Sequence, residues 1–305
     1  MDLPEIGWLP WRQALVLAAL LAAFSMVISL VQRRTVQKST RLASVSFITR
    51  EAALVLVLYA VWQYVGSMTV SGLDQAQATG LWLAELQSTF GWPSEFSIQQ
   101  VVIGNDAVIS AADWYYRYLH VPVFVVTLGW ILLFRRVAWP FTRTTIAVLT
   151  GLCLLIQLKP VAPPRLLPEL GIIDTAAVNG RSVYALIPGA NEYAAMPSVH
   201  VAWACAVALI IIIAARSRWR WLALAYPLVT SYVVVVTGNH FIIDGVVAVL
   251  LLGIAVSVAM LIPSQRPPSR SLMGNERQYG AGSGLAEQRT GDGHGPTGAQ
   301  GVIDE

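Results

Sequence analysis

The chain has 305 residues, of which 56% are hydrophobic and only 12% are charged, a composition that excludes an ordinary soluble domain and indicates a multi-pass membrane protein. The formal net charge of +3 says little, because the basic residues are grouped in particular connections, and no feature indicates a nucleic-acid partner. Cys153 and Cys205 both lie inside apolar stretches, so we expect packed thiols rather than a disulfide or a zinc site.

Seven apolar runs approach the length of about 20 residues that a membrane-spanning helix needs. They are Ala14–Val31, Ala52–Val70, Trp114–Phe134, Thr144–Leu158, Ser198–Ala215, Trp221–Thr237 and Phe241–Ile262. The fourth run is the shortest, and Pro227 in the sixth favours a kink. The first run lacks a basic segment before it and a small-residue cleavage site after it, so we interpret it as a retained helix and not a signal peptide. The sequence therefore predicts an all-α bundle of about seven transmembrane helices.

Basic residues occur in alternate connections, which predicts the orientation of the bundle. They are Arg33, Arg34, Lys38, Arg41 and Arg50 in the first connection, Arg135, Arg136 and Arg143 in the third, Arg216, Arg218 and Arg220 in the fifth, and Arg266, Arg270, Arg277 and Arg289 in the tail. We expect these segments in the cytoplasm. The connection from Ser71 to Asp113 has no lysine or arginine, so we expect it outside, together with the N-terminus, Lys159–Pro197 and Gly238–His240.

The outer connection carries Trp82, Leu86 and Phe90 at helical spacing, which predicts an amphipathic helix. Such a helix could lie along the membrane surface or pack on the outer faces of the spans. Residues 263–305 are rich in glycine, serine, glutamine and charged residues and predict a disordered cytoplasmic tail. We divide the chain into an N-terminal helix with its basic connection (1–50), a membrane domain (51–262) and this tail.

Two histidines stand where outer connections meet apolar runs. His200 follows Pro197-Ser198-Val199, and His240 follows Gly238-Asn239 with Asp244 four residues later. Ionisable residues at membrane depth are expensive and indicate function. Residues four apart share a helix face, so the carboxylate of Asp244 could hold one ring nitrogen of His240 while the other attacks a substrate.

Polar residues of the same outer face suit the binding of a phosphate. Ser198 is a good N-cap, and the free N–H groups of the helix behind it form an anion site. Lys159 and Arg165 flank a proline-rich stretch and would add positive charge and a bidentate fork. With Asn239 in the same set, we expect phosphoryl transfer through a phosphohistidine, with a second imidazole as the acid. No carboxylate cluster for magnesium is visible, and we expect no metal and no cofactor.

These segments resemble the type 2 phosphatidic acid phosphatase (PAP2) superfamily of membrane lipid phosphatases and phosphotransferases. The usual motifs of that family are a lysine and an arginine, then Pro-Ser-Gly-His, then Ser-Arg-x5-His-x3-Asp. Here the second motif has Val199 for glycine, and the third keeps His240 and Asp244 but has Val234 in place of arginine.

The first motif departs in spacing, because Lys159 and Arg165 are one residue closer than usual and Leu166 replaces a proline. The stretches 162–165 and 237–240 look most like the inositol-phosphotransferase-like (Aur1-type) branch. The resemblance covers about residues 114–262. It implies a six-helix catalytic core within residues 51–262, with one additional N-terminal helix.

The resemblance also implies a role for each matching residue. By it, His240 is the nucleophile, Asp244 its partner and His200 the general acid, while Ser198, Lys159 and Arg165 bind phosphate. Arg165 is the best substitute for the missing third-motif arginine, ahead of Arg117 and Arg181. His120, at the outer end of the third run, could line the headgroup pocket or simply be a packed histidine.

We therefore expect a membrane enzyme that acts on a lipid phosphate ester in the bilayer, at the outer face. Water would complete hydrolysis, whereas the hydroxyl of a lipid or a polyol would complete transfer. The transferase alternative moves an inositol phosphate, or another polar headgroup, to a lipid acceptor. A transporter or channel is the alternative of another class, although its polar residues would lie near the membrane midplane. A non-catalytic lipid-binding relative is a further alternative, suggested by Val199 and Val234.

Overall fold

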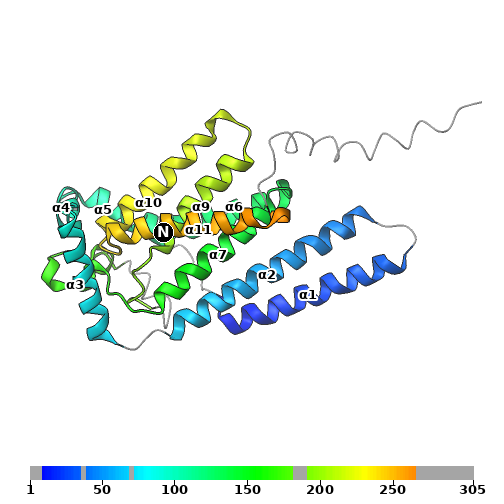
Figure 1. Cartoon of the computed structure of the whole chain (residues 1–305), viewed down its shortest axis with the longest axis horizontal. Helices are drawn as coiled ribbons and strands as arrows, with labels where there is room; N and C mark the ends of the chain where they lie inside the picture. The colour runs from blue at the N-terminus through cyan, green and yellow to red at the C-terminus, as the bar shows by residue number, and fades with distance from the viewer. Residues whose placement is uncertain (1–8, 36–38, 69–71, 181–190, 266–305) are drawn as a thin grey trace, which may run out of the picture. The chain divides into compact units, whose positions relative to one another are not determined.

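The computed structural model describes residues 9–35, 39–68, 72–180 and 191–265. Apart from an isolated bridge between Val161 and Ala194, these ranges contain helices, turns and loops but no strand. Six helical segments are long and apolar enough to cross a bilayer, and the shorter helix Val199–Ala214 is also apolar. The predicted all-α membrane bundle is thus confirmed (Figure 1). The expected tail beyond residue 265, Lys38 and Arg181 lie outside the described residues.

The elements have the following bounds. The α-helices are α1 (Trp11–Arg34), α2 (Thr40–Met68), α3 (Leu73–Thr89), α4 (Glu95–Gln100), α5 (Asp106–Trp114), α6 (His120–Phe134), α7 (Trp139–Gln157), α8 (Thr175–Val178), α9 (Val199–Ala214), α10 (Ala225–Val236) and α11 (Ile242–Leu261). A π-helical turn, η1 (Tyr115–Leu119), joins α5 to α6, and short 3-10 segments are η2 (Pro164–Leu166), η3 (Pro168–Leu170), η4 (Arg218–Leu224) and η5 (Pro263–Gln265).

The second span begins well before the apolar run that predicted it. Helix α2 starts at Thr40, so most of the connection expected over residues 33–50 is helical. An apolar run ends where charged residues begin, but in the fold the charge of Glu51 is neutralised by tertiary contacts. Glu51 is 2% exposed and accepts hydrogen bonds from Trp139 Nε1 at 3.0 Å and Arg143 Nη1 at 2.6 Å. This carboxylate ties α2 to α7 and explains why α7, predicted to be short, extends over Trp139–Gln157.

Two further boundaries differ from the predicted runs. The third span begins at Asp106, because α5, η1 and α6 continue into one another. Pro227 lies in the first turn of α10, where the missing N–H is tolerated, and not in the helix interior, where a kink was expected. The preceding residues form the 3-10 segment η4.

Helix α3 packs on the protein with a face different from the predicted apolar stripe. Its buried residues are Ala76, Gly80, Leu83 and Gln87, whereas Trp82 and Phe90 are exposed. A Cβ on Gly80 would lie 2.7 Å from the carbonyl oxygen of Ala162, so the close approach requires glycine. The helix is therefore packed against the stretch that leads to Arg165, and its aromatic stripe faces outward.

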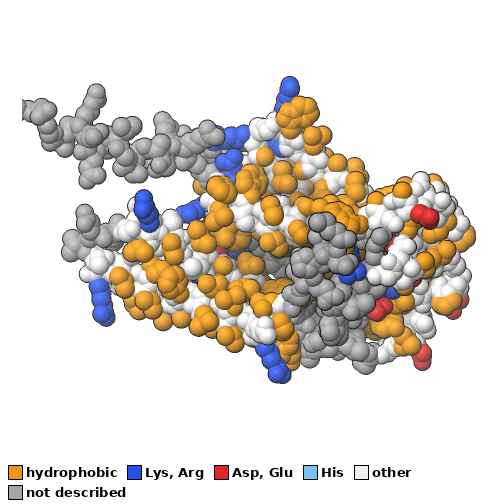
Figure 2. Space-filling view, turned by 180° about the vertical axis from the view of Figure 1, so that it is seen from behind, with side chains coloured by type: hydrophobic (Ala, Val, Ile, Leu, Met, Phe, Trp, Pro, Cys, Tyr) orange, Lys and Arg blue, Asp and Glu red, His pale blue; other side chains and the backbone are white. Residues whose placement is uncertain are grey.

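A central apolar cluster joins α6, α7, α9, α10 and α11 and is rich in small side chains on α9 and α11. A second, smaller cluster lies under α3 and the start of α11. Figure 2 shows acidic side chains at the end of the molecule that α3–α5 occupy, with several basic side chains toward the opposite end and a largely hydrophobic surface between them. This distribution agrees with a multi-pass membrane protein.

Candidate active site

His240 lies in the tight turn between α10 and α11, and the backbone of that turn is closely constrained. The carbonyl oxygen of Val234 accepts hydrogen bonds from the N–H groups of Asn239 and His240, at 3.0 and 3.1 Å. Gly238 has a φ of 68°, and a Cβ there would lie 2.8 Å from Ile172 Cγ2. Only glycine meets both conditions easily, so the turn places His240 in one position.

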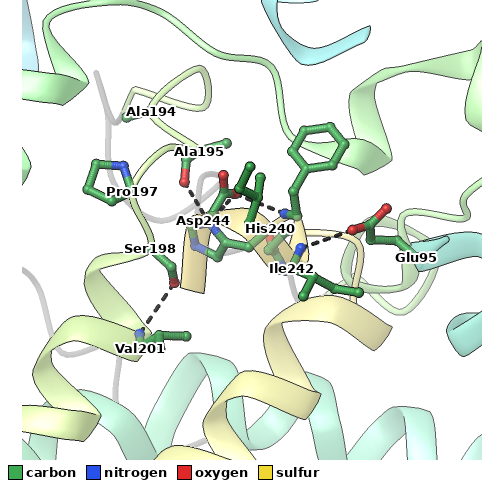
Figure 3. A network of polar contacts seen from close by, with 12 residues as sticks. Glu95, Ala194, Ala195, Pro197, Ser198, Val201, His240, Ile242 and Asp244 are labelled. Atoms are coloured by element: carbon green, nitrogen blue, oxygen red, sulfur yellow. Dashed lines mark hydrogen bonds and ion pairs between the residues drawn. The ribbon is translucent and has the colours of Figure 1, made fainter. Parts of the chain in front are cut away.

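The ring of His240 is held through Nδ1. Its nearest partner is the carbonyl oxygen of Ala195 at 2.7 Å, and Asp244 Oδ2 is more distant at 3.3 Å (Figure 3). Because a carbonyl oxygen can only accept, Nδ1 must carry the hydrogen. In the neutral ring Nε2 then has the free lone pair. The sequence predicted Asp244 as the group that orients the ring, but the structure gives the shorter contact to a backbone carbonyl.

The surroundings of His240 favour the neutral ring. Burial lowers the pKa of His240 to about 4; the hydrogen bond to Ala195 raises it, and the positive charge of Arg165 lowers it further. The ring is only 6% exposed. At neutral pH the ring is therefore uncharged, and its Nε2 can accept a proton or attack an electrophile.

Asp244 connects the starts of α9 and α11. Its Oδ2 accepts a hydrogen bond from the N–H of Phe241 at 2.9 Å, and its backbone oxygen accepts one from the N–H of Ser198 at 3.3 Å. Ser198 is fully buried, and its Oγ accepts from the N–H of Val201 at 3.3 Å, which confirms its predicted position as the N-cap of α9. The two helices that carry the histidines thus begin side by side.

The two helix starts differ in which N–H groups remain available. At α11 the N–H groups of Phe241, Ile242 and Ile243 are bonded to side chains. At α9 the N–H groups of Val199 and His200 have no hydrogen-bond partner among the described residues. Free N–H groups at a helix N-terminus attract anions. Donors for an anion are therefore available at the start of α9 and not at the start of α11.

His200 belongs to a row of rings behind His240. Its ring centroid lies 6.0 Å from that of His240, 4.3 Å from Tyr116 in a stacked contact, and 4.7 Å from His120. His120 is 2% exposed, with Nδ1 2.8 Å from the hydroxyl of Tyr226. His120 is thus packed behind His200, which agrees with the packed alternative for this residue more than with a headgroup contact.

Arg165 is next to His240, but its guanidinium already has partners. Its Nε donates to Asn239 Oδ1 at 3.1 Å, and its Nη atoms pair with Asp174 at 2.8 Å and Glu192 at 3.2 Å. Its backbone N–H donates to the carbonyl oxygen of Gly238 at 2.9 Å. Arg165 and Asn239 therefore support the turn that carries His240, and an incoming phosphate would have to compete with two carboxylates.

The other expected cations are placed differently. Lys159 has an exposed side chain after the end of α7, and no described residue forms an ion pair with it. Arg117 lies over the ring of Tyr118, with its Nε buried and without a hydrogen-bond partner. Val234, at the position of the usual third-motif arginine, is 2% exposed within the apolar core.

Several residues of the site carried no signal in the sequence. The orienting contact of Ala195 is a backbone oxygen, which has no residue preference. Asp174, Glu192, Glu95 and Gln87 lie in the segments that connect the apolar runs, where acidic and amide side chains are ordinarily solvated. Pairing each of them with its partner requires the folded chain.

Residues 81–258, more than half of the chain, match the family model of the PAP2 superfamily, and the chain belongs to that superfamily. Membership supports, at the level of class, a phosphatase-type enzyme acting on phosphate esters of lipids. The match begins within α3, so it includes residues of α3–α5 that the motif resemblance over residues 114–262 did not reach. No curated protein and no solved structure matches the chain.

Proposed function

We propose that this protein is a metal-independent phosphatase or phosphotransferase of lipid phosphate esters that works through a phosphohistidine at His240. The observation that carries the proposal is the geometry of His240: a neutral ring, fixed through Nδ1 by Ala195 and Asp244, beside the imidazole of His200. A histidine held in this way presents Nε2 to an electrophile.

In the proposed first step, the lone pair of His240 Nε2 attacks phosphorus and the bond to the lipid oxygen breaks. His200, protonated in the complex with the anionic substrate, gives its proton to that leaving oxygen. The N–H groups of Val199 and His200 at the start of α9 stabilise the negative charge on the equatorial oxygens. Asp244 and the Ala195 carbonyl stabilise the positive charge of the phosphorylated ring.

In the second step, neutral His200 removes a proton from the acceptor while the acceptor oxygen attacks phosphorus. The P–N bond breaks and its electron pair returns to His240. Water as acceptor gives hydrolysis, and a hydroxyl group gives transfer. Transfer of an inositol phosphate, or another polar headgroup phosphate, to the hydroxyl of a lipid acceptor is the second form of the proposal and uses the same attack by His240.

Arg165 enters the proposal as the guanidinium nearest to His240. A phosphate could take one of its Nη donors by displacing a carboxylate, and Glu192 is the better candidate because it is more exposed than Asp174 and farther away. Lys159, exposed at the same side of the chain, would contribute long-range attraction. We propose that the site faces the extracytoplasmic side and that the C-terminal tail is cytoplasmic.

The test is phosphate release or transfer by the purified protein from radiolabelled lipid phosphates, compared between wild type and His240→Gln. We expect turnover and a labelled intermediate in the wild type alone, trapped by alkaline quench because phosphohistidine is acid-labile. Retained turnover in His240→Gln would reject the nucleophile, and an inactive wild type with tight lipid binding would favour a non-catalytic relative. Lipid-independent solute uptake into proteoliposomes would favour a transporter.

A further inference from the structure

Helices α3 and α4 contribute three polar side chains that are almost completely buried. Gln87, Glu95 and Gln99 are 3%, 3% and 0% exposed, although they belong to an outer connection rich in polar residues. A buried polar group is unfavourable unless it is hydrogen-bonded. The partners of these three side chains therefore indicate why they are buried.

Glu95 and Gln87 bind the first turn of α11. Oε1 of Glu95 accepts from the N–H of Ile242 at 2.9 Å, on the side of the turn away from Ala195 and Ser198 (Figure 3). Oε1 of Gln87 accepts from the N–H of Ile243 at 2.8 Å, and its Nε2 donates to Glu95 at 2.8 Å. These N–H groups have no acceptor inside the helix, so the side chains of Gln87 and Glu95 supply the missing acceptors.

Gln99 holds the other end of the same turn. Its Nε2 donates to the carbonyl oxygens of Val236, the last residue of α10, and Ile173, at 3.0 and 2.9 Å. Its Oε1 accepts from the N–H of Ile173 at 2.9 Å. Ile173 directly precedes Asp174, the carboxylate that pairs with Arg165. One side chain thus fixes the end of α10 relative to the loop beside the guanidinium.

We propose that Gln87, Glu95 and Gln99 are positioning residues that fix the turn between α10 and α11 and so hold His240 in its reacting position. The inference rests on the proposed function, since a reacting position presupposes the phosphohistidine step. His240 is two residues before Ile242, so a shift at the start of α11 moves its Nε2 relative to the N–H groups of α9. A carboxylate at this helix start also stabilises it through the helix dipole.

The kinetic test compares Glu95→Ala, Glu95→Gln and Gln87→Ala, with hydrolysis of phosphatidic acid in detergent micelles as the assay. Glu95→Gln keeps an oxygen for the N–H of Ile242, whereas both alanine variants remove an acceptor. Glu85→Ala is the matched control, because Glu85 is an exposed carboxylate on the same outer segment. We expect the alanine variants to lower kcat about tenfold or more, with KM changed less than about twofold, because a misplacement of about 1 Å at a reacting group can cost about 100-fold.

The rescue pattern separates positioning from folding. Glu95→Gln should recover most of kcat, and Glu85→Ala should match the wild type. Wild-type kcat per folded molecule in both Glu95→Ala and Gln87→Ala would overturn the proposal. Equal losses in Glu95→Ala and Glu95→Gln, together with a raised KM, would overturn it as well. If Glu95→Ala does not fold, Gln87→Ala and Glu95→Gln carry the same comparison.

A second measurement does not depend on turnover. Amide hydrogen exchange in nanodiscs should be slow at Ile242 and Ile243 in the wild type and in Glu85→Ala. It should be faster at Ile242 in Glu95→Ala and at Ile243 in Gln87→Ala. Unchanged exchange in both variants would overturn the inference. A wild type without phosphate release that depends on His240 would overturn the proposed function, and exchange would still decide whether these side chains hold the turn.

Discussion

Two roles of Asp244 can be separated by substitution. Its Oδ2 accepts the N–H of Phe241 at 2.9 Å, which caps α11, and the same oxygen lies 3.3 Å from Nδ1 of His240. The ring has a closer partner in Ala195, at 2.7 Å. Asp244→Asn keeps an oxygen for the cap and removes the charge, whereas Asp244→Ala removes both. The carboxylate should therefore act mainly on the charge that develops on the ring and less on its orientation.

The expected magnitudes follow from these contacts. A hydrogen bond to a charged group contributes about 1.5–3 kcal/mol. Since each 1.36 kcal/mol is about tenfold in rate, Asp244→Asn should lower kcat about 10- to 100-fold. Its effect on stability should be small, because Oδ1 already lacks a partner and the new amide nitrogen takes its place. Asp244→Ala should in addition lower stability by about 1 kcal/mol through loss of the cap.

The assay is lipid phosphate release, with the phosphohistidine quantified after alkaline quench and unfolding followed by thermal denaturation in the same detergent. We expect less intermediate in Asp244→Asn with a nearly native melting temperature. A wild-type kcat in Asp244→Asn would refute the reasoning, because the Ala195 carbonyl alone would then be sufficient. A large loss of stability in Asp244→Asn would show that the charge is needed for folding.

Four further outcomes are expected. Because burial lowers the pKa of His240 from 6.5 to about 4, a pH titration of kcat/KM should show little change as pH falls through 6.5 and a decline only near 4. The neutral ring contributes fully to stability above pH 6.5, and a pH titration of the free energy of unfolding should show that contribution being lost between pH 6.5 and 4. Arg165→Lys should lose about tenfold or more in kcat/KM, about 1.4 kcal/mol, since an ammonium group cannot reproduce the two parallel N–H donors of a guanidinium. Glu192→Gln should lower KM by freeing an Nη donor of Arg165. Native kinetics in both variants would exclude Arg165 from phosphate binding. Activity should survive EDTA, because the described residues contain no group of three or more His, Cys, Asp or Glu side chains arranged to hold a metal ion; a loss restored by magnesium would contradict this. In intact cells a membrane-impermeant thiol reagent should label Ser88→Cys but not Arg34→Cys, and the reverse pattern would invert the topology.

The number and approximate place of the spans were predictable because a helix that crosses a bilayer needs a long run of apolar residues, and such runs are visible in the sequence. Their starts were not. Thr40–Arg50 contains charges that end an apolar run, and only the contact of Glu51 with Trp139 and Arg143 shows that a helix can carry them. Local hydropathy does not report such pairing, since the partners are about 90 residues apart.

The candidate site was predictable where side chains have a fixed spacing. His240, Asp244, Ser198 and His200 come together as their spacing indicated, because two helix starts adjoin. The partners of Arg165 were not predictable in the same way. Asp174 and Glu192 are 9 and 27 residues away along loops, and no periodicity connects them to the arginine.

The replacement of the usual third-motif arginine by Val234 has a physical explanation in the turn. The side chain of Val234 is buried in the apolar core, while its carbonyl oxygen accepts the N–H groups of both Asn239 and His240. In this chain the position therefore shapes the turn through its backbone and contributes no charge to the anion. In the proposed site the charge for a phosphate must come from elsewhere. The N–H groups at the start of α9, which have no hydrogen-bond partner among the described residues, are fixed donors at the adjoining helix start. Such donors are already oriented, so they need no reorganisation when the phosphate binds. Arg165 is held by two carboxylates, so under the proposal a substrate phosphate would have to displace one of them. We therefore expect substitutions of Asp174 and Glu192 to change the affinity for substrate.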